Sequence, residues 1–113
     1  MKPELKQEWI KALRSGDYHQ GQGQLRAMYR DKDHFCCLGV LVDITFPEKW
    51  EVMTETCSPQ MDIQYWVDKE EALITKHLLR RLDLRDGDQK VLAQMNDDGD
   101  DFQHIADYIE TNL

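Results

Sequence analysis

The sequence has no apolar run that approaches the roughly 20 residues needed to cross a bilayer. Its first residues, MKPELKQEW, lack the apolar segment of a secretory signal peptide. Cysteine is scarce and odd in number, with Cys36 and Cys37 adjacent and Cys57 apart from them. Adjacent cysteines rarely form a native disulfide, so free thiols in a reducing compartment are the simpler interpretation. We therefore expect a cytoplasmic protein without a membrane segment.

The sequence also lacks the patterns that mark a metal or catalytic centre. It has neither the C-x₂₋₄-C nor the H-x₃₋₅-H spacing of structural zinc sites. The sequence does not match a calcium-binding loop, whose pattern begins with Asp and has Gly at its sixth position. With Gly99 as that glycine, the first position is occupied by Gln94. There is no G-x-S-x-G motif and no phosphate-binding loop. We expect no metal and no cofactor.

Positive charge is nearly missing from the C-terminal quarter, where carboxylates gather. Residues 86–113 carry eight Asp and Glu and one lysine, which gives 1 − 8 = −7. The whole chain is 14 − 22 = −8, so residues 1–85 stand at 13 − 14 = −1. Phosphates must be neutralised by clustered Lys and Arg, so we expect no direct contact with nucleic acid. The distribution favours a partner with a basic surface.

The length of 113 residues predicts a single domain over 1–113. The run over 35–46 is apolar apart from Asp43, and Pro47 ends it, which predicts a buried helix at the centre of the core. We expect an α+β fold, compact and mostly helical, with a small antiparallel hairpin or sheet. The other predicted elements are a helix over 3–15, a hairpin between 25–29 and 34–36, a turn at Ser58-Pro59, a strand over 63–67, a helix over 69–82 and two C-terminal helices.

The C-terminal helices have the clearest signals. Asp86 with Gln89 three residues later predicts a capping box. Asp100 or Asp101 is expected to cap the last helix. An apolar stripe at i, i+3, i+4 and i+7 then predicts its buried face. We expect this stripe and the N-terminal helix to pack on the central element through Phe102, Ile105, Ala106 and Ile109, and through Leu5, Trp9 and Leu13.

Two of the acidic residues are not explained by local helix physics. Asp97 and Asp98 fall at a helix C-terminus, where the macrodipole disfavours a carboxylate by about 0.3–1 kcal/mol. One interpretation of the whole cluster is helix caps and a solvated face. The other is a partner-binding surface, whose residues would be Asp97, Asp98, Asp100, Asp101, Asp107 and Glu110.

A polar loop rich in glycine and glutamine follows the first helix. Loops with an aromatic and several polar side chains can recognise partners, so Tyr18, Gln20, Gln22 and Gln24 form a possible recognition loop. The alternative is a connector that hydrogen-bonds across the edge of the core. A small enzyme would need a pocket near this loop, with His19, His34 or Cys36 as its working groups.

Four segments carry a resemblance to a known group of proteins. They are WIKALRSGDYHQGQGQL at 9–25, FCCLGVLVD at 35–43, VLAQMNDDG at 91–99 and FQHIADYIE at 102–110. In this order they resemble small proteins carried by tailed bacteriophages and prophages. The resemblance implies a phage or prophage origin and action inside a bacterial host cell. It implies no activity, substrate or catalytic residue.

Together these features favour a small phage-type accessory protein that is a binder rather than an enzyme. It would bind a host or phage protein through the acidic C-terminal helices. A DNA mimic that inhibits a nucleic-acid-binding protein is one alternative, and the small enzyme is the other. The oligomeric state stays open.

Overall fold

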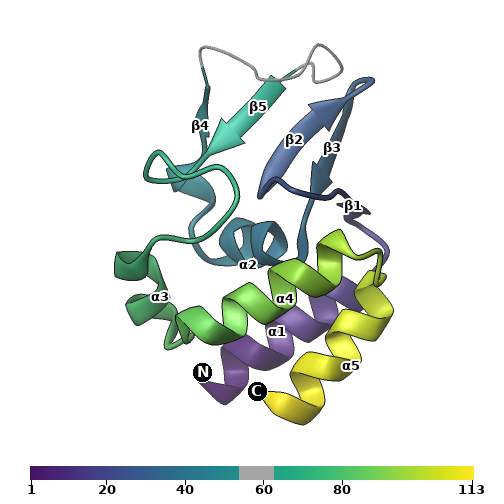
Figure 1. Ribbon diagram of the computed structural model, residues 1–113, viewed down its shortest axis with the longest axis vertical. Helices are drawn as coiled ribbons and strands as arrows, with labels where there is room; N and C mark the ends of the chain where they lie inside the picture. The colour runs from purple at the N-terminus through teal and green to yellow at the C-terminus, as the bar shows by residue number, and fades with distance from the viewer. Residues whose placement is uncertain (54–62) are drawn as a thin grey trace.

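The computed structural model describes residues 1–53 and 63–113 and has an α+β fold, which confirms the predicted fold class (Figure 1). Cys57 and the predicted turn at Ser58-Pro59 lie outside the described residues. In chain order the elements are α1 (Pro3–Arg14), β1 (His19–Gln20), β2 (Arg26–Tyr29), β3 (Lys32–Phe35), α2 (Cys37–Thr45), η1 (Pro47–Lys49), β4 (Glu51–Val52), β5 (Ile63–Trp66), α3 (Lys76–Leu82), α4 (Asp86–Asp97) and α5 (Phe102–Asn112).

The sheet lies at one end of the molecule, the helices α1, α4 and α5 gather at the other, and α2 lies between them (Figure 1). The strand order is β1-β3-β2-β5-β4; β1 pairs with β3 in parallel and the other pairs are antiparallel. Of the helices in the described part of the chain, none is both long and apolar enough to span a bilayer.

The predicted hairpin is present as β2 and β3. Its register runs from Arg26 opposite Phe35 to Tyr29 opposite Lys32. The two residues between the strands both have positive φ, 50° and 63°, as a two-residue turn matching the strand twist requires. The strand predicted over 63–67 also forms, as Ile63–Trp66.

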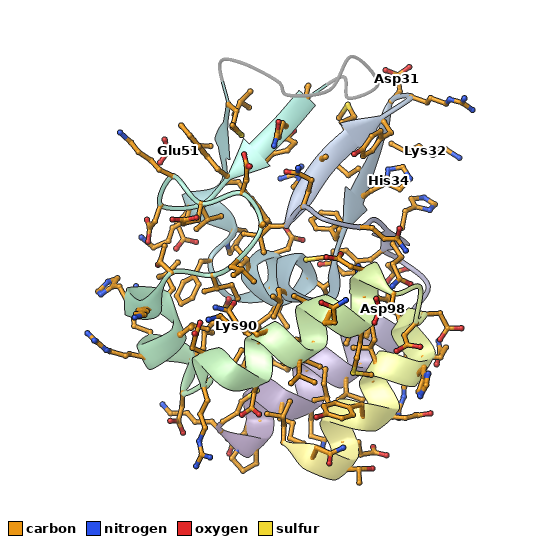
Figure 2. All side chains as sticks on the ribbon, viewed as in Figure 1. Asp31, Lys32, His34, Glu51, Lys90 and Asp98 are labelled. Atoms are coloured by element: carbon orange, nitrogen blue, oxygen red, sulfur yellow. The ribbon has the colours of Figure 1, made fainter. Side chains whose placement is uncertain are left out.

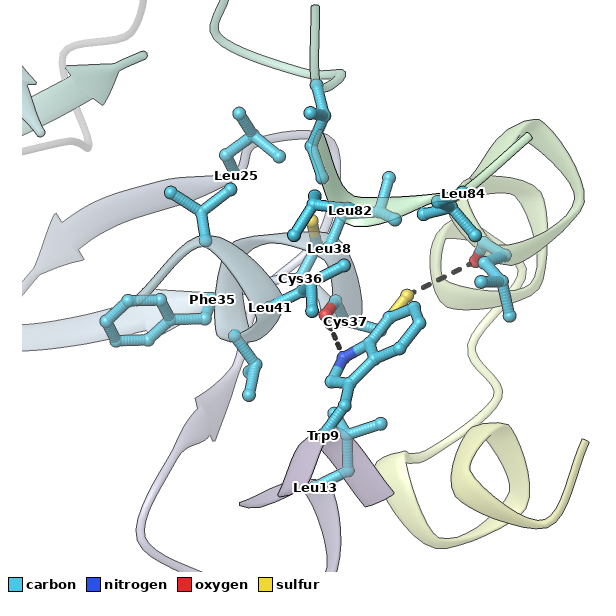
Figure 3. Close-up of a cluster of buried hydrophobic side chains, with 14 of the residues drawn as sticks. Trp9, Leu13, Leu25, Phe35, Cys36, Cys37, Leu38, Leu41, Leu82 and Leu84 are labelled. Carbon is cyan, nitrogen blue, oxygen red and sulfur yellow. Dashed lines mark hydrogen bonds between the residues drawn. The ribbon is translucent and has the colours of Figure 1, made fainter. Parts of the chain in front are cut away.

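The apolar run forms the central helix α2, as predicted, although its first residues end β3. Residues 37–42 are all buried. The helix lies so close to the backbone of Leu25 that a Cβ on Gly39 would sit 1.7 Å from the Leu25 carbonyl oxygen. From the opposite side the Trp9 indole N–H donates to the Cys37 carbonyl oxygen at 2.9 Å, which fixes α1 to α2 (Figure 3).

The helix predicted over 69–82 is wrong in its first half, because only 76–82 is helical. Asp68 and Lys69 both have positive φ, and Val67 and Glu70 exchange backbone hydrogen bonds of 2.9 and 3.0 Å, so the chain makes a tight turn there. A hydrophobic spacing that fits a helix cannot reveal this turn. Within the helical part, His77 and Arg81 are exposed.

The predicted capping box is also wrong. Arg85 is the N-cap of α4 and makes no side-chain cap. The Gln89 side chain, 1% exposed, instead donates to the Ile74 carbonyl and accepts from the Ile74 N–H, both at 3.0 Å. A buried amide that satisfies both groups of a distant residue holds the chain before α3 against α4.

The last helix begins as predicted, because the Asp101 carboxylate accepts the His104 N–H at 2.9 Å. Its stripe of Phe102, Ile105, Ala106 and Ile109 is buried. This stripe packs mainly against α1 rather than directly on α2, which corrects the expected arrangement. The N- and C-termini consequently lie near each other (Figure 1).

Candidate functional site

Three segments distant in sequence meet at the buried side chain of Asn96, near the end of α4. Its Oδ1 accepts the Gln20 side chain at 3.0 Å and the backbone N–H of Cys37 at 3.2 Å. Its Nδ2 donates to the Gly21 carbonyl oxygen at 2.7 Å. Asn96 is fully buried, so these bonds replace water completely. We call this group of Gln20, Gly21, Cys37 and Asn96 the Asn96 hub.

The glutamine loop is tied to the end of α4 by further bonds. The Gln20 amide also donates to the Asp100 carbonyl oxygen at 2.7 Å, and the Gln22 amide reaches the Asn96 carbonyl at 3.4 Å. The Gly23 N–H donates to the Asp97 carboxylate at 2.9 Å. The loop is therefore bonded across the edge of the core, as the connector interpretation expects, and its recognition role stays a prediction.

The other two predicted recognition residues are likewise engaged within the protein. The Tyr18 hydroxyl donates to Asp43 of α2 at 2.7 Å, while Gln24 accepts the Gln64 side-chain amide at 2.7 Å. Burial and the neighbouring Asp43 carboxylate raise the pKa of Tyr18 far above its ordinary value. Tyr18 therefore remains a hydrogen-bond donor across the physiological pH range.

The six predicted partner-binding residues separate into two groups. Asp107 and Glu110 lie on α5 opposite Arg14 of α1, whose guanidinium contacts them at 2.6 and 3.3 Å. These hydrogen bonds raise the pKa of Arg14. The two carboxylates remain exposed, at 69% and 53%, but their charge is partly neutralised by the same molecule.

The other four residues form the turn between α4 and α5: Asp97, Asp98, Asp100 and Asp101. We call them the α4–α5 carboxylates. None forms an ion pair with a lysine or arginine within residues 1–53 and 63–113; Asp100 has His104 at 3.3 Å. Asp98 lies at the far end of α4 from Lys90 (Figure 2).

A tertiary contact explains one of the two aspartates at the end of α4, Asp97, whereas Asp98 makes a contact within the helix. Asp97 holds the Gly23 N–H, and Asp98 accepts the Gln94 amide at 2.8 Å. A hydrogen bond to a charged acceptor contributes about 1.5–3 kcal/mol when well formed, so the bond from Gly23 exceeds the macrodipole cost of at most about 1 kcal/mol at Asp97. The exposed Gln94–Asp98 pair, four residues apart on one helix, contributes only about 0.2–0.5 kcal/mol. Of the two residues that local helix physics left unexplained, Asp97 thus fixes a distant loop.

Comparison with known proteins places the whole chain, residues 1–113, in one match to the model of a domain of unknown function, DUF8296. The chain belongs to this family. No curated protein and no solved structure matches it.

The hollow beside the glutamine loop in this DUF8296 domain has a volume of about 570 Å³ and is lined in part by Tyr18, His19, Arg26 and Asp43. Its polar groups are largely bonded to one another. Asp43 accepts the Trp50 indole N–H at 3.0 Å as well as Tyr18. These contacts join α2 to the sheet.

Arg26 lines this hollow. It bonds Asp33 at 2.9 and 3.2 Å, and its guanidinium lies 4.0 Å from the centre of the Tyr65 ring. The ring centres of Phe35 and Trp50 each lie 5.4 Å from the guanidinium. A cation packed among aromatic rings and paired with a carboxylate is a strong structural contact.

Within the described residues, two of the groups considered for an enzyme line different cavities. Cys36 lines a partly open cavity of about 230 Å³ with Gly23 and Asp97, whereas His19 lines the hollow of Tyr18. The rings of His19 and His34 lie 5.8 Å apart. Burial raises the pKa of the Cys36 thiol to about 11, so it is protonated near neutral pH.

One charged region was not recognised in the sequence. Residues 75–85, TKHLLRRLDLR, carry four Lys and Arg on and after the short helix α3. The charge sum over residues 1–85 conceals this cluster, because carboxylates elsewhere in that part cancel it. A sliding charge window would have revealed it. Within the described ranges, no three His, Cys, Asp or Glu side chains are placed to hold a metal ion.

Proposed function

We propose that this protein is a non-catalytic, phage-type accessory factor that acts inside a bacterial cell. It contacts a basic surface of a host or phage protein through the α4–α5 carboxylates. The supporting observation is that four carboxylates within five residues have no lysine or arginine partner in the part of the chain that the structure describes. Surface charge of this kind sets the rate of association and the choice of partner more than the final affinity.

The position of these carboxylates is held before any partner arrives. Asp97 is tied to Gly23, Asp101 caps α5, and the Asn96 hub fixes the turn to α2. A preorganised charged surface loses little conformational entropy on binding. Asp107 and Glu110 have a smaller role in this proposal, because Arg14 already offsets their charge.

Asparagine substitution tests the proposal with little disturbance of the fold. Changing all four α4–α5 carboxylates to asparagine removes their charge but retains an oxygen acceptor for the Gly23 N–H and a good N-cap for α5. The probe is a fluorescein-labelled oligolysine peptide, with binding followed by fluorescence anisotropy at low and at physiological salt. We expect the variant to bind the peptide at least about tenfold more weakly than wild type.

A matched control removes the same amount of charge elsewhere. The variant Glu4→Gln/Glu8→Gln/Glu48→Gln/Glu51→Gln changes four exposed carboxylates on α1, η1 and β4. It should bind the peptide within about twofold of wild type at physiological salt, where distant charges are screened. Equal weakening in both variants would mean that only net charge matters, and would refute the assigned surface.

A further inference from the structure

A second charged surface, of opposite sign, lies at the other end of α4. Residues 75–85 carry Lys76, Arg80, Arg81 and Arg85 against a single carboxylate, Asp83, so the segment sums to 4 − 1 = +3. The chain as a whole is −8, so the remainder stands at −8 − 3 = −11. We call these four cationic residues the α3 basic face.

The cations of this face are exposed, and none forms an ion pair with a residue in the described ranges. The two neighbouring carboxylates have ion-pair partners outside the face, although hydrogen bonds from Gln89 and Lys90, with a smaller contribution from the charge of Lys76, lower the pKa of Asp86. Asp83 pairs with the amino group of Met1 at 3.3 Å, and Asp86 pairs with Lys90 at 3.0 Å. Clustered cations repel one another, and a bound anionic partner would relieve that repulsion.

The face also contains a small apolar depression. Lys76, Leu79, Arg80, Leu84 and Asp86 line a hollow of about 160 Å³. The two leucines are 3% and 5% exposed. Its volume is close to the roughly 150 Å³ of an enclosed cavity that holds benzene, but the hollow is largely open to solvent, so it offers a shallow seat for one apolar side chain. Cations at its edge could then meet carboxylates on either side of that side chain.

We propose that the α3 basic face docks an acidic segment of a partner protein, with one apolar side chain of that segment seated on Leu79 and Leu84. The face is distinct from the α4–α5 carboxylates, because α3 lies at the start of α4 and the acidic turn at its end (Figure 1). The two surfaces can therefore be occupied together, and this proposal does not depend on the acidic one.

Nucleic acid fits this face less well than an acidic segment. Sites for single strands stack bases on exposed aromatic rings. The aromatic ring beside this face, Phe46, is 7% exposed and lies beneath the Arg81 guanidinium at 4.8 Å. A duplex carries about one negative charge per 1.7 Å of its axis, so it would bring many more anionic groups towards a body of charge −11 than a short acidic segment does.

Three probes test the proposal on the intact protein by fluorescence anisotropy. The first is a fluorescein-labelled peptide in which Glu alternates with Leu, the second carries Ser in place of each Leu, and the third is an oligothymidylate of equal charge. We expect the Glu-Leu peptide to bind at least about tenfold more tightly than either of the others. Tighter binding of the oligothymidylate, or equal binding of both peptides, would overturn the proposal.

The variant Lys76→Gln/Arg80→Gln/Arg85→Gln removes three cations from the face. It should bind the Glu-Leu peptide at least about tenfold more weakly than wild type. The control Lys2→Gln/Lys11→Gln/Lys32→Gln removes three exposed cations from elsewhere, and should stay within about twofold of wild type. Equal losses in the two variants would refute the site. The comparison of the two peptides on wild-type protein needs no variant and decides the apolar contact alone.

Discussion

Replacing Asn96 by alanine should destabilise the fold more than any other single change at the α4–α5 turn. The side chain makes three hydrogen bonds, to Gln20, Gly21 and Cys37, and is fully buried. Each such bond contributes about 0.5–1.5 kcal/mol, and an unpartnered buried N–H costs about 1–3 kcal/mol. Gln20 retains the Asp100 carbonyl, but the Cys37 N–H at the start of α2 has no intrahelical acceptor.

The expected loss for Asn96→Ala is therefore about 3–5 kcal/mol, a large part of the roughly 5–15 kcal/mol typical of a domain. Urea denaturation followed by intrinsic tryptophan fluorescence, to which the buried Trp9 contributes together with Trp50 and Trp66, measures it, and the thermal midpoint should fall by about 10–20 °C. The control is Gln94→Ala on the exposed side of α4, which should change stability by less than about 0.5 kcal/mol. A loss below about 1 kcal/mol for Asn96→Ala would refute the role given to the hub.

Two further predictions concern α2. Gly39→Ala should lower the free energy of unfolding by more than about 3 kcal/mol or prevent folding, because the new Cβ meets the Leu25 backbone. The control Gly87→Ala has open space in α4 and should raise it by about 0.5–1 kcal/mol. Equal changes for the two variants in denaturant unfolding would contradict the close packing of α2 on Leu25. The second prediction concerns the thiols of Cys36 and Cys37, tested in a Cys57→Ser background. At about pH 8 they should react with a disulfide reagent about 100-fold more slowly in the native protein than in an unfolded control. The reason is that burial holds the pKa of Cys36 at about 11 and raises that of Cys37 above its ordinary value. Because folding raises the pKa of these thiols, their contribution to stability should be complete below the pKa of the unfolded thiol and should decrease as the pH rises above it. Rapid reaction of the thiols in native protein would disprove their burial.

The elements with local signals were predicted from sequence. The stripe of α5, its Asp101 cap and the hairpin each depend on residues that are neighbours along the chain. The central helix over 35–46 was also identified, because a long apolar run ended by proline has few other solutions.

The contacts that shape the candidate site could not be predicted in this way. Asn96 finds its partners 59 to 76 residues away, and nothing in the pattern of α4 distinguishes it from a solvent-facing polar residue. The pairing of Arg14 with α5 likewise depends on how two helices from opposite ends of the chain meet. The spacing of Gln89 from Asp86 predicts a capping box, but the Gln89 side chain instead bonds the backbone N–H and carbonyl of Ile74, a contact that the sequence does not reveal.

Quantitative co-purification from a bacterial lysate tests the central claim most directly. Wild type, the four-asparagine variant of the α4–α5 carboxylates and the Glu4/Glu8/Glu48/Glu51 glutamine control would each serve as bait, with mass spectrometry of the retained proteins. The account predicts a basic protein that is retained by wild type and by the control but lost by the asparagine variant. Retention of the same proteins in the same amounts by all three would contradict it.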